Sequence, residues 1–223
     1  KSAKDNGIKV VQVGEGADEL FYGYDHWIRF MKLNNFLRPI TKSRSNSFNF
    51  KSHRGNMLSN ILLNRTSFAG GALGFNLPEI NNLLVEGITQ EYELIHFVDN
   101  KWDEYFSNKN SYLSKWMTLI DLQIRLPELL LMRMDKLVMQ SSIEARVPFL
   151  DHKLIEFVLS VPESIIFDKN NTKPLLKKVA SKHISKEIFN RKKQGFRAPV
   201  GEWIKKDENY FYEAIKEFNS TTG

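Results

Sequence analysis

The sequence contains no cysteine. This absence excludes disulfide bonds, zinc sites built on thiolates and a cysteine nucleophile anywhere in the 223 residues. Apolar runs are short, and none approaches the ~18 consecutive apolar residues that a membrane-spanning helix requires. Residues 1–5 are polar and are not followed by the apolar core of a signal peptide. We therefore expect a cytoplasmic protein with no membrane span.

Charge is distributed unevenly along the chain. The formal net charge is +6, but residues 169–206 hold 12 Lys or Arg against only two acids, Glu187 and Glu202. A strongly basic segment suggests an anionic partner such as nucleotide phosphates, pyrophosphate, nucleic acid or an acidic surface. Any single lysine in it is more simply explained by a solvated helix face.

A glycine-rich acidic turn follows the first apolar run. Residues 8–13 are predicted to form a buried strand, and Gly14, Glu15, Gly16 and Asp18 follow directly. Glycine permits positive φ and close backbone approach, and open α/β sheets bind ligands at the carboxyl ends of their strands. An acid there can take a proton or hold a hard cation. The alternative is an ordinary strand-to-helix turn whose acids favour the helix N-terminus.

Most of the remaining chain is predicted to be helical. One helix is expected from Asp18 to about Leu33, and a second over residues 111–126, which Pro127 should end. The next segment, residues 128–141, is apolar nearly all round, which is typical of a buried helix. Further helices are expected over residues 152–161 and 173–184 and in a last region around residues 203–212. Since one strand cannot form a sheet, we expect the other strands to lie outside this chain, as part of a larger protein.

Three charged positions in apolar surroundings need an explanation. Glu144 and Arg146 lie in Ser-Ile-Glu-Ala-Arg-Val-Pro-Phe-Leu-Asp, between two apolar helices, and Arg133 lies within the first of these helices. Buried charges must be paired, so these residues form either an internal ion pair or a site. Lys193, in Arg-Lys-Lys-Gln-Gly-Phe, can reach into a cleft as a mobile point charge, or it can simply belong to a solvated loop.

Taken together, in their order and at their separations, these segments resemble one family. The matching motifs are Gly-Glu-Gly-Ala-Asp-Glu, Arg-Met-Asp-Lys leading into Ser-Ile-Glu-Ala-Arg-Val-Pro-Phe-Leu-Asp, Lys-Pro-Leu-Leu-Lys and Arg-Lys-Lys-Gln-Gly-Phe. They resemble the C-terminal part of the synthetase domain of glutamine-hydrolysing asparagine synthetases, over residues 5–206. The resemblance implies a mainly α chain with a short N-terminal β-strand region, the C-terminal helical lobe of an α/β adenine-nucleotide α-hydrolase (PP-loop ATP pyrophosphatase) fold. Residues 1–223 would then be a partial asparagine synthetase domain.

The resemblance also implies a reaction and its partners. In this family a glutaminase domain releases ammonia from glutamine. The synthetase domain uses ATP with Mg²⁺ to convert the side-chain carboxylate of aspartate into β-aspartyl-AMP, and ammonia then displaces AMP to give asparagine. We thus expect a ligase that uses ATP, aspartate and glutamine-derived ammonia, works with a glutaminase domain fused upstream or separate, and takes Mg²⁺ as cofactor.

Roles for individual residues follow from the same resemblance. Glu15 would act as a carboxylate general base toward the attacking ammonia, and Asp18 would help hold Mg²⁺ on the pyrophosphate. Backbone N–H groups around Gly14 and Gly16 would face the anionic groups of the intermediate. Lys193 would neutralise charge on the phosphate and on the developing oxyanion. A buried charged network lining the site and the ammonia route would comprise Arg133, Glu144 and Arg146, for which purely structural pairing is the alternative.

Two features of the family are missing from these residues. The pyrophosphate-binding loop Ser-Gly-Gly-x-Asp-Ser and the N-terminal cysteine of the glutaminase are both absent. We expect them upstream, and we expect the 223 residues alone to be inactive.

Alternatives remain open at this point. A sister enzyme could amidate another carboxylate, on a sugar, a peptide or a β-lactam precursor, although relatives that form β-lactams typically carry tyrosine at the place of Glu15. A basic nucleic-acid-binding module is a remote alternative, because only Phe189 and Phe196 accompany the basic residues between Lys169 and Pro199. A scaffold that has lost catalysis is disfavoured because Glu15, Asp18 and Lys193 are all present.

Overall fold

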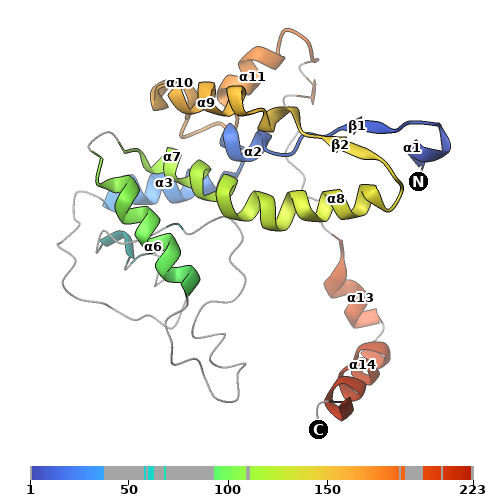
Figure 1. The fold of residues 1–223 in the computed structure, drawn as a ribbon. Helices are drawn as coiled ribbons and strands as arrows, with labels where there is room; N and C mark the ends of the chain where they lie inside the picture. The colour runs from blue at the N-terminus through green and yellow to red at the C-terminus, as the bar shows by residue number, and fades with distance from the viewer. Residues whose placement is uncertain are drawn as a thin grey trace. The chain divides into compact units, whose positions relative to one another are not determined.

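The computed structural model describes residues 2–37, 58, 60–62, 68, 93–108, 111–185, 187–188, 198–206 and 208–221. The chain divides into two units, Lys1–His183 and Ile184–Gly223. The helices of the first unit are α1 (Ser2–Asp5), α2 (Ala17–Leu20), α3 (Asp25–Leu37), α6 (Glu93–Phe106), α7 (Leu113–Ile120), α8 (Met132–Met139), α9 (His152–Ser160), α10 (Glu163–Ile166) and α11 (Pro174–Ala180) (Figure 1). Its strands are β1 (Val10–Gln12) and β2 (Glu144–Arg146), its π-helical segment is Asp121–Leu131, and its 3-10 turn is Pro148–Leu150.

β1 and β2 form a two-stranded parallel sheet. Val10 is in register with Glu144 and Gln12 with Arg146, and the Glu144 N–H donates to the Lys9 carbonyl at 2.8 Å. The prediction that only one strand would be found was therefore wrong. The second strand was missed because it has three residues and two of them are charged, so it carries no apolar alternation.

The prediction of a buried first strand was also wrong. Ile8 is 46% and Val10 is 39% exposed. The described residues supply only β2 as a neighbouring strand. The apolar side chains of β1 thus lie on a sheet that the described part of the chain leaves uncovered.

A single helical run connects α7 to α8. Pro127 was predicted to end the first helix, but it lies inside the π-helical segment, and the Met132 N–H bonds the Pro127 carbonyl five residues earlier. Proline lacks the N–H that a helix needs, and its ring crowds the preceding turn. The wider π turn accommodates this residue, so the axis continues without a break (Figure 1).

The helix predicted from Asp18 to Leu33 is instead two helices. α2 ends at Leu20 and α3 begins at Asp25. Between them Tyr22 adopts a left-handed backbone with φ of 58°, and the Gly23 N–H donates to the Asp18 carbonyl at 2.8 Å. This connection closes the helical turn and lets the chain change direction.

Aromatic side chains form much of the core of the first unit. Trp27 of α3 and Trp116 of α7 have no exposed surface. The Trp116 ring meets Trp102 of α6 edge-on at 5.3 Å between centroids, and its indole N–H donates to the Phe68 carbonyl at 2.8 Å. Tyr22 lies in the same cluster. Each such ring buries about 150–250 Å², so the two tryptophans on α3 and α7 account for much of the buried apolar surface of this unit.

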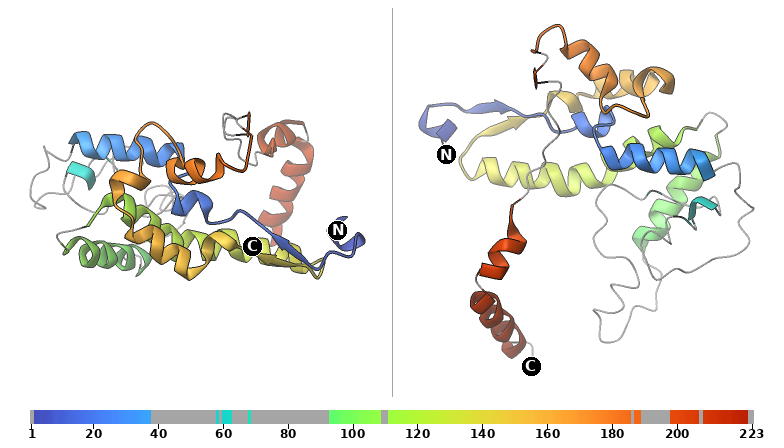
Figure 2. Two further views of the ribbon diagram at one scale, coloured as in Figure 1. Left: turned by 90° about the horizontal axis from the view of Figure 1, so that it is seen from above. Right: turned by 180° about the vertical axis from the view of Figure 1, so that it is seen from behind.

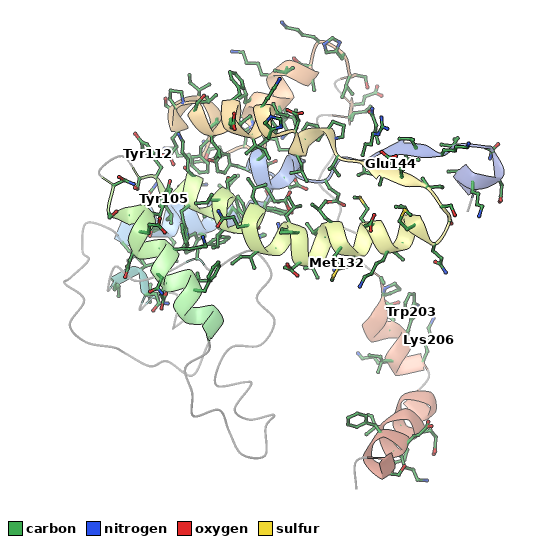
Figure 3. All side chains as sticks on the ribbon, in the orientation of Figure 1. Tyr105, Tyr112, Met132, Glu144, Trp203 and Lys206 are labelled. Carbon is green, nitrogen blue, oxygen red and sulfur yellow. The ribbon has the colours of Figure 1, made fainter. Side chains whose placement is uncertain are left out.

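The helix predicted over residues 128–141 exists but is not buried. Leu137 is 63%, Met139 is 55% and Met132 is 46% exposed (Met132 is labelled in Figure 3). α9 is likewise only partly covered, with Phe157 62% exposed and Val158 buried. Of the described elements, those that contact α8 are mainly β2 and the preceding π-helical segment, so most of its apolar surface has no cover.

The second unit contains α13 (Val200–Lys206) and α14 (Glu208–Thr221), as predicted for the last region. Trp203, Tyr212 and Phe218 of this unit are exposed. Figure 2 shows both units in two further views. Among the described helices, none is both long and apolar enough to span a membrane.

Tyr22 provides a test of the packing around the break between α2 and α3. Burial raises its pKa from 10.0 to about 12, although the Ser114 and Thr118 hydroxyls partly oppose this. The buried phenol resists ionisation, so its contribution to stability is complete below pH 10 and is lost as the pH rises through 12. A shift of two pKa units corresponds to about 2–3 kcal/mol.

We expect Tyr22→Phe to make the free energy of unfolding fall less steeply between pH 9 and pH 12, in urea titrations of the full-length protein. Tyr212→Phe is the matched control, because Tyr212 is 69% exposed. Superimposable pH profiles for Tyr22→Phe and the unmodified protein would contradict the assignment.

Candidate active site

The acidic turn lies between the end of β1 and the one-turn helix α2. Gly16 caps this helix with φ of 88°, in the left-handed region that glycine adopts readily. Its Cα also packs so tightly on Leu150 that a Cβ there would collide with Leu150 Cδ2. At Gly14, by contrast, an added Cβ would meet nothing within 4 Å. Packing and backbone conformation together therefore require glycine at residue 16, and neither requires it at residue 14.

Leu150 belongs to the Val-Pro-Phe-Leu-Asp part of the second motif, so the two motifs are in direct contact. Phe149 of the same motif meets Phe21 edge-on, with ring centroids 6.1 Å apart. The β1–β2 pairing extends this contact, since the Val13 N–H donates to the Arg146 carbonyl at 2.9 Å. Segments about 130 residues apart are thereby held at one end of the small sheet.

Asp18 forms an ion pair that was not predicted. Its Oδ1 lies 2.8 Å from Lys173 Nζ, and both side chains are 27% exposed. Gly23 leaves the space for this pair, because a Cβ there would collide with the Asp18 carboxylate and the Lys173 stem. Lys173 has a left-handed backbone (φ 52°), and its N–H donates to the carbonyl of Tyr22, another left-handed residue, at 3.4 Å. Strained backbone of this kind concentrates at functional sites.

Glu19, the next residue along, points into the core. Its carboxylate is 1% exposed and binds Arg125 Nη2 at 2.7 Å. The Tyr24 hydroxyl donates to the same oxygen at 2.5 Å. Arg125 Nε binds the buried Asp121 at 2.7 Å, and its guanidinium lies 4.7 Å from the centroid of the Tyr24 ring. We call these four side chains the Arg125 cluster.

The electrostatic consequences appear in two members of the Arg125 cluster. Burial, and then the hydrogen bond to Glu19, raise the pKa of Tyr24 well above its ordinary value. Burial alone would lower the pKa of Arg125, but Asp121, Tyr24 and Glu19 together raise it. The phenol thus stays protonated and the guanidinium stays charged at neutral pH.

The three residues predicted to form a buried network are exposed. Glu144 and Arg146 do pair, at 2.8 Å, but their side chains are 59% and 62% exposed (Glu144 is labelled in Figure 3). Arg133 on α8 is exposed as well. The prediction of burial was wrong, because the apolar sequence around these residues is itself largely uncovered in the described part of the chain.

The other predicted site residues are placed in part. Glu15 is half-buried on the turn, and Asp18 follows it on α2. Lys193 lies outside the described residues, as do the other residues from 189 to 197. The role expected for Lys193 therefore stays a prediction.

Asp18 is the residue that the family resemblance assigns to Mg²⁺. Across the described ranges no three His, Asp or Glu side chains gather as a metal cluster. Lys173 presents its ammonium to the carboxylate that was expected to bind the cation. Hard cations take six or more oxygen ligands, several of them water. The described residues do not by themselves fit a magnesium site.

Sequence reasoning missed Lys173, Glu19 and Arg125. Lys173 begins the matching motif Lys-Pro-Leu-Leu-Lys and the helix expected over residues 173–184, but no role at the site was predicted for it. α11 does begin at Pro174, although it ends at Ala180 rather than near residue 184. Glu19 was read as an acid favouring a helix N-terminus. The one available signal was Arg125 four residues after Asp121, on a helix whose neighbouring positions are apolar.

The fold and the turn define this chain as a helical lobe that presents an acidic loop at the end of a parallel strand. The family model described as asparagine synthase matches residues 1–220. The chain therefore belongs to the asparagine synthase family.

Individual relatives agree with this assignment. The chain is 28% identical, over 99% of its length, to asparagine synthetase [glutamine-hydrolyzing] 1 of Bacillus subtilis (strain 168), and covers 35% of that protein. It is 27% identical, over 90% of its length, to a putative asparagine synthetase [glutamine-hydrolyzing] of Mycobacterium bovis, covering 31%. It is 23% identical, over 88% of its length, to amidase chyE of Penicillium rubens, covering 33%. The chain thus spans about a third of the length of these relatives, and no solved structure matches it.

The requirement for glycine at residue 16 can be tested by substitution. Gly16→Ala should lower the free energy of unfolding by about 1–3 kcal/mol through backbone strain, with a similar overpacking cost against Leu150. Gly14→Ala, the matched control, should change it by less than about 0.5 kcal/mol.

Adding Leu150→Ala to Gly16→Ala should remove the collision and leave the strain, so the two effects should not add. Urea unfolding of the full-length variants measures all of these terms. Equal destabilisation by the two glycine substitutions would show that neither φ nor Leu150 matters at residue 16.

Proposed function

We propose that this chain is the C-terminal part of a synthetase domain that uses ATP to amidate aspartate. The side-chain carboxylate of aspartate would become β-aspartyl-AMP, and ammonia from glutamine would attack its carbonyl carbon. The new C–N bond forms as the bond to AMP breaks, which gives asparagine. Family membership supports this reaction class, and the observation that carries it is the acidic turn at the end of β1, held by Leu150 of the second motif.

Glu15 is the proposed general base. A carboxylate can accept the proton that the ammonia nitrogen must lose as it becomes an amide. Gly14 precedes it at a position open to solvent, where an added Cβ meets no other atom within 4 Å. Backbone at this point therefore has room for a ligand to approach closely.

Lys193 is the proposed counter-charge for the phosphate and the developing oxyanion. The basic character of residues 169–206 supports an anionic ligand near this segment. Arg133, Glu144 and Arg146 remain proposed contacts for the substrate or intermediate, with their exposed positions open to such contacts. Mg²⁺ would be held largely by residues beyond the described ranges, within which no three His, Asp or Glu side chains gather as a metal cluster.

The rest of the enzyme is proposed to lie in a longer protein. The relatives are about three times as long as this chain. The uncovered side chains of β1 and of α8 provide an apolar surface for the remaining strands of the sheet. The pyrophosphate loop and the glutaminase domain would belong to that remaining part, and the protein would act in the cytoplasm.

Product analysis of the full-length protein tests the reaction. With ATP, magnesium, aspartate and either glutamine or ammonia, we expect asparagine and AMP by mass spectrometry. Glu15→Gln and Lys193→Ala should each lower kcat by at least about 100-fold, in line with losing a general base or an electrostatic stabiliser.

Matched controls separate these roles from general effects of charge. Glu156→Gln on α9 and Lys32→Ala on α3 remove the same charges at exposed positions and should leave kcat unchanged. ATP cleavage without asparagine would keep the adenylating reaction and point to another carboxylate as acceptor. Full activity in both Glu15→Gln and Lys193→Ala would overturn the residue assignments.

The 223 residues alone should form no asparagine. They lack the pyrophosphate-binding loop of the family, so no such loop would bind the pyrophosphate that leaves ATP. The measurement is the same assay on the isolated chain, with the full-length protein as positive control. Asparagine formation by the isolated chain would contradict the expectation.

A further inference from the structure

The Arg125 cluster lies directly beneath the acidic turn. We propose that Arg125 is a positioning residue, which holds the buried carboxylate of Glu19 and thereby places the turn that carries Glu15 and Asp18. The catalytic consequence rests on the function proposed above, whereas the placement of the turn does not.

The first step is that α2 cannot hold its own position. It has four residues, with a left-handed glycine before it and a left-handed tyrosine after it. A helix of one turn is unstable in isolation, because forming the first turn costs more than it returns. The location of this turn therefore depends on contacts with the helices beside it.

The second step is that both the side chain and the backbone of Glu19 are held by hydrogen bonds. Its carboxylate accepts hydrogen bonds from Arg125 at 2.7 Å and from Tyr24 at 2.5 Å. Its backbone carbonyl accepts one from the Thr118 hydroxyl at 3.0 Å. Since neighbouring residues of a helix point in different directions, fixing Glu19 toward the core leaves Asp18 directed away from it.

The third step is that Arg125 is itself held rigidly. Nε binds Asp121, Nη2 binds Glu19, and the guanidinium plane faces the Tyr24 ring. A planar fork can bridge two carboxylates in this way, whereas the point charge of a lysine cannot reproduce both bonds. Two buried carboxylates share this one guanidinium, so loss of the fork removes the cation that binds both of them.

Arg125→Lys in the full-length protein tests the proposal. We expect a fall in kcat of about 10- to 100-fold with little change in KM for ATP, because a small misplacement of catalytic groups has effects of this size. Hydrogen exchange should become faster at the amides of Leu20, Phe21 and Gly23, which bond the carbonyls of Gly16, Ala17 and Asp18. Exchange within α7 should not change.

Lys115→Met is the matched control. Lys115 is a partly buried cation on α7, and its ammonium donates to the Leu159 carbonyl at 2.7 Å, away from the turn. Its loss should leave both kcat and the exchange rates of Leu20, Phe21 and Gly23 unchanged. A merely structural role for Arg125 would lower the stability of Arg125→Lys without the selective change at the turn.

Each outcome decides the proposal. Unchanged kcat or unchanged exchange in an active Arg125→Lys protein overturns it. If the unmodified protein forms no ATP-dependent product, the proposed function fails, and faster exchange at the turn in Arg125→Lys alone then supports the positioning role. If Arg125→Lys does not fold, Glu19→Gln keeps the size of the side chain but removes the negative charge that Arg125 binds at 2.7 Å, and the same selective exchange is expected. Its absence there overturns the proposal.

Discussion

The ion pair between Glu19 and Arg125 is the interaction on which the geometry of the turn depends. A carboxylate that is 1% exposed needs a partner, and removing one member of such a buried pair costs about 3–5 kcal/mol. Arg125 comes from the π-helical segment, more than 100 residues away from Glu19 in sequence. The turn is consequently attached to the longest helical run among the described residues rather than to its own short helix.

Other contacts join the same place from further segments. Leu150 fills the space above Gly16, Lys173 meets Asp18, and β2 pairs with β1. Three motifs that are far apart in sequence thus converge on one strand end, where open α/β sheets bind their ligands. The apolar surfaces of β1 and α8 remain uncovered in the described part of the chain, consistent with a lobe that covers about a third of the length of its relatives.

Local patterns predicted the elements more reliably than their burial. The helix expected over residues 111–126 is present as α7 and the π-helical segment that follows it. The prediction that Pro127 would end a helix failed because the rule that proline ends α-helices does not hold in a π turn. β2 was not predicted because three residues are too few to show a periodic pattern. Burial depends on which elements lie nearby. The apolar sequence of α8 predicted a buried helix, but it carries no information on how few of the described elements pack against that helix.

The sequence by itself determined the family, the glycine-rich acidic turn and most helices, because these depend on residue types at short, fixed separations. Only the tertiary structure decided which charges are paired. Asp18 meets Lys173 and Glu19 meets Arg125, while the expected buried network is an exposed pair on β2. Ion pairs between distant segments depend on how the helices pack, and the spacing of residues along one segment carries no information about that packing.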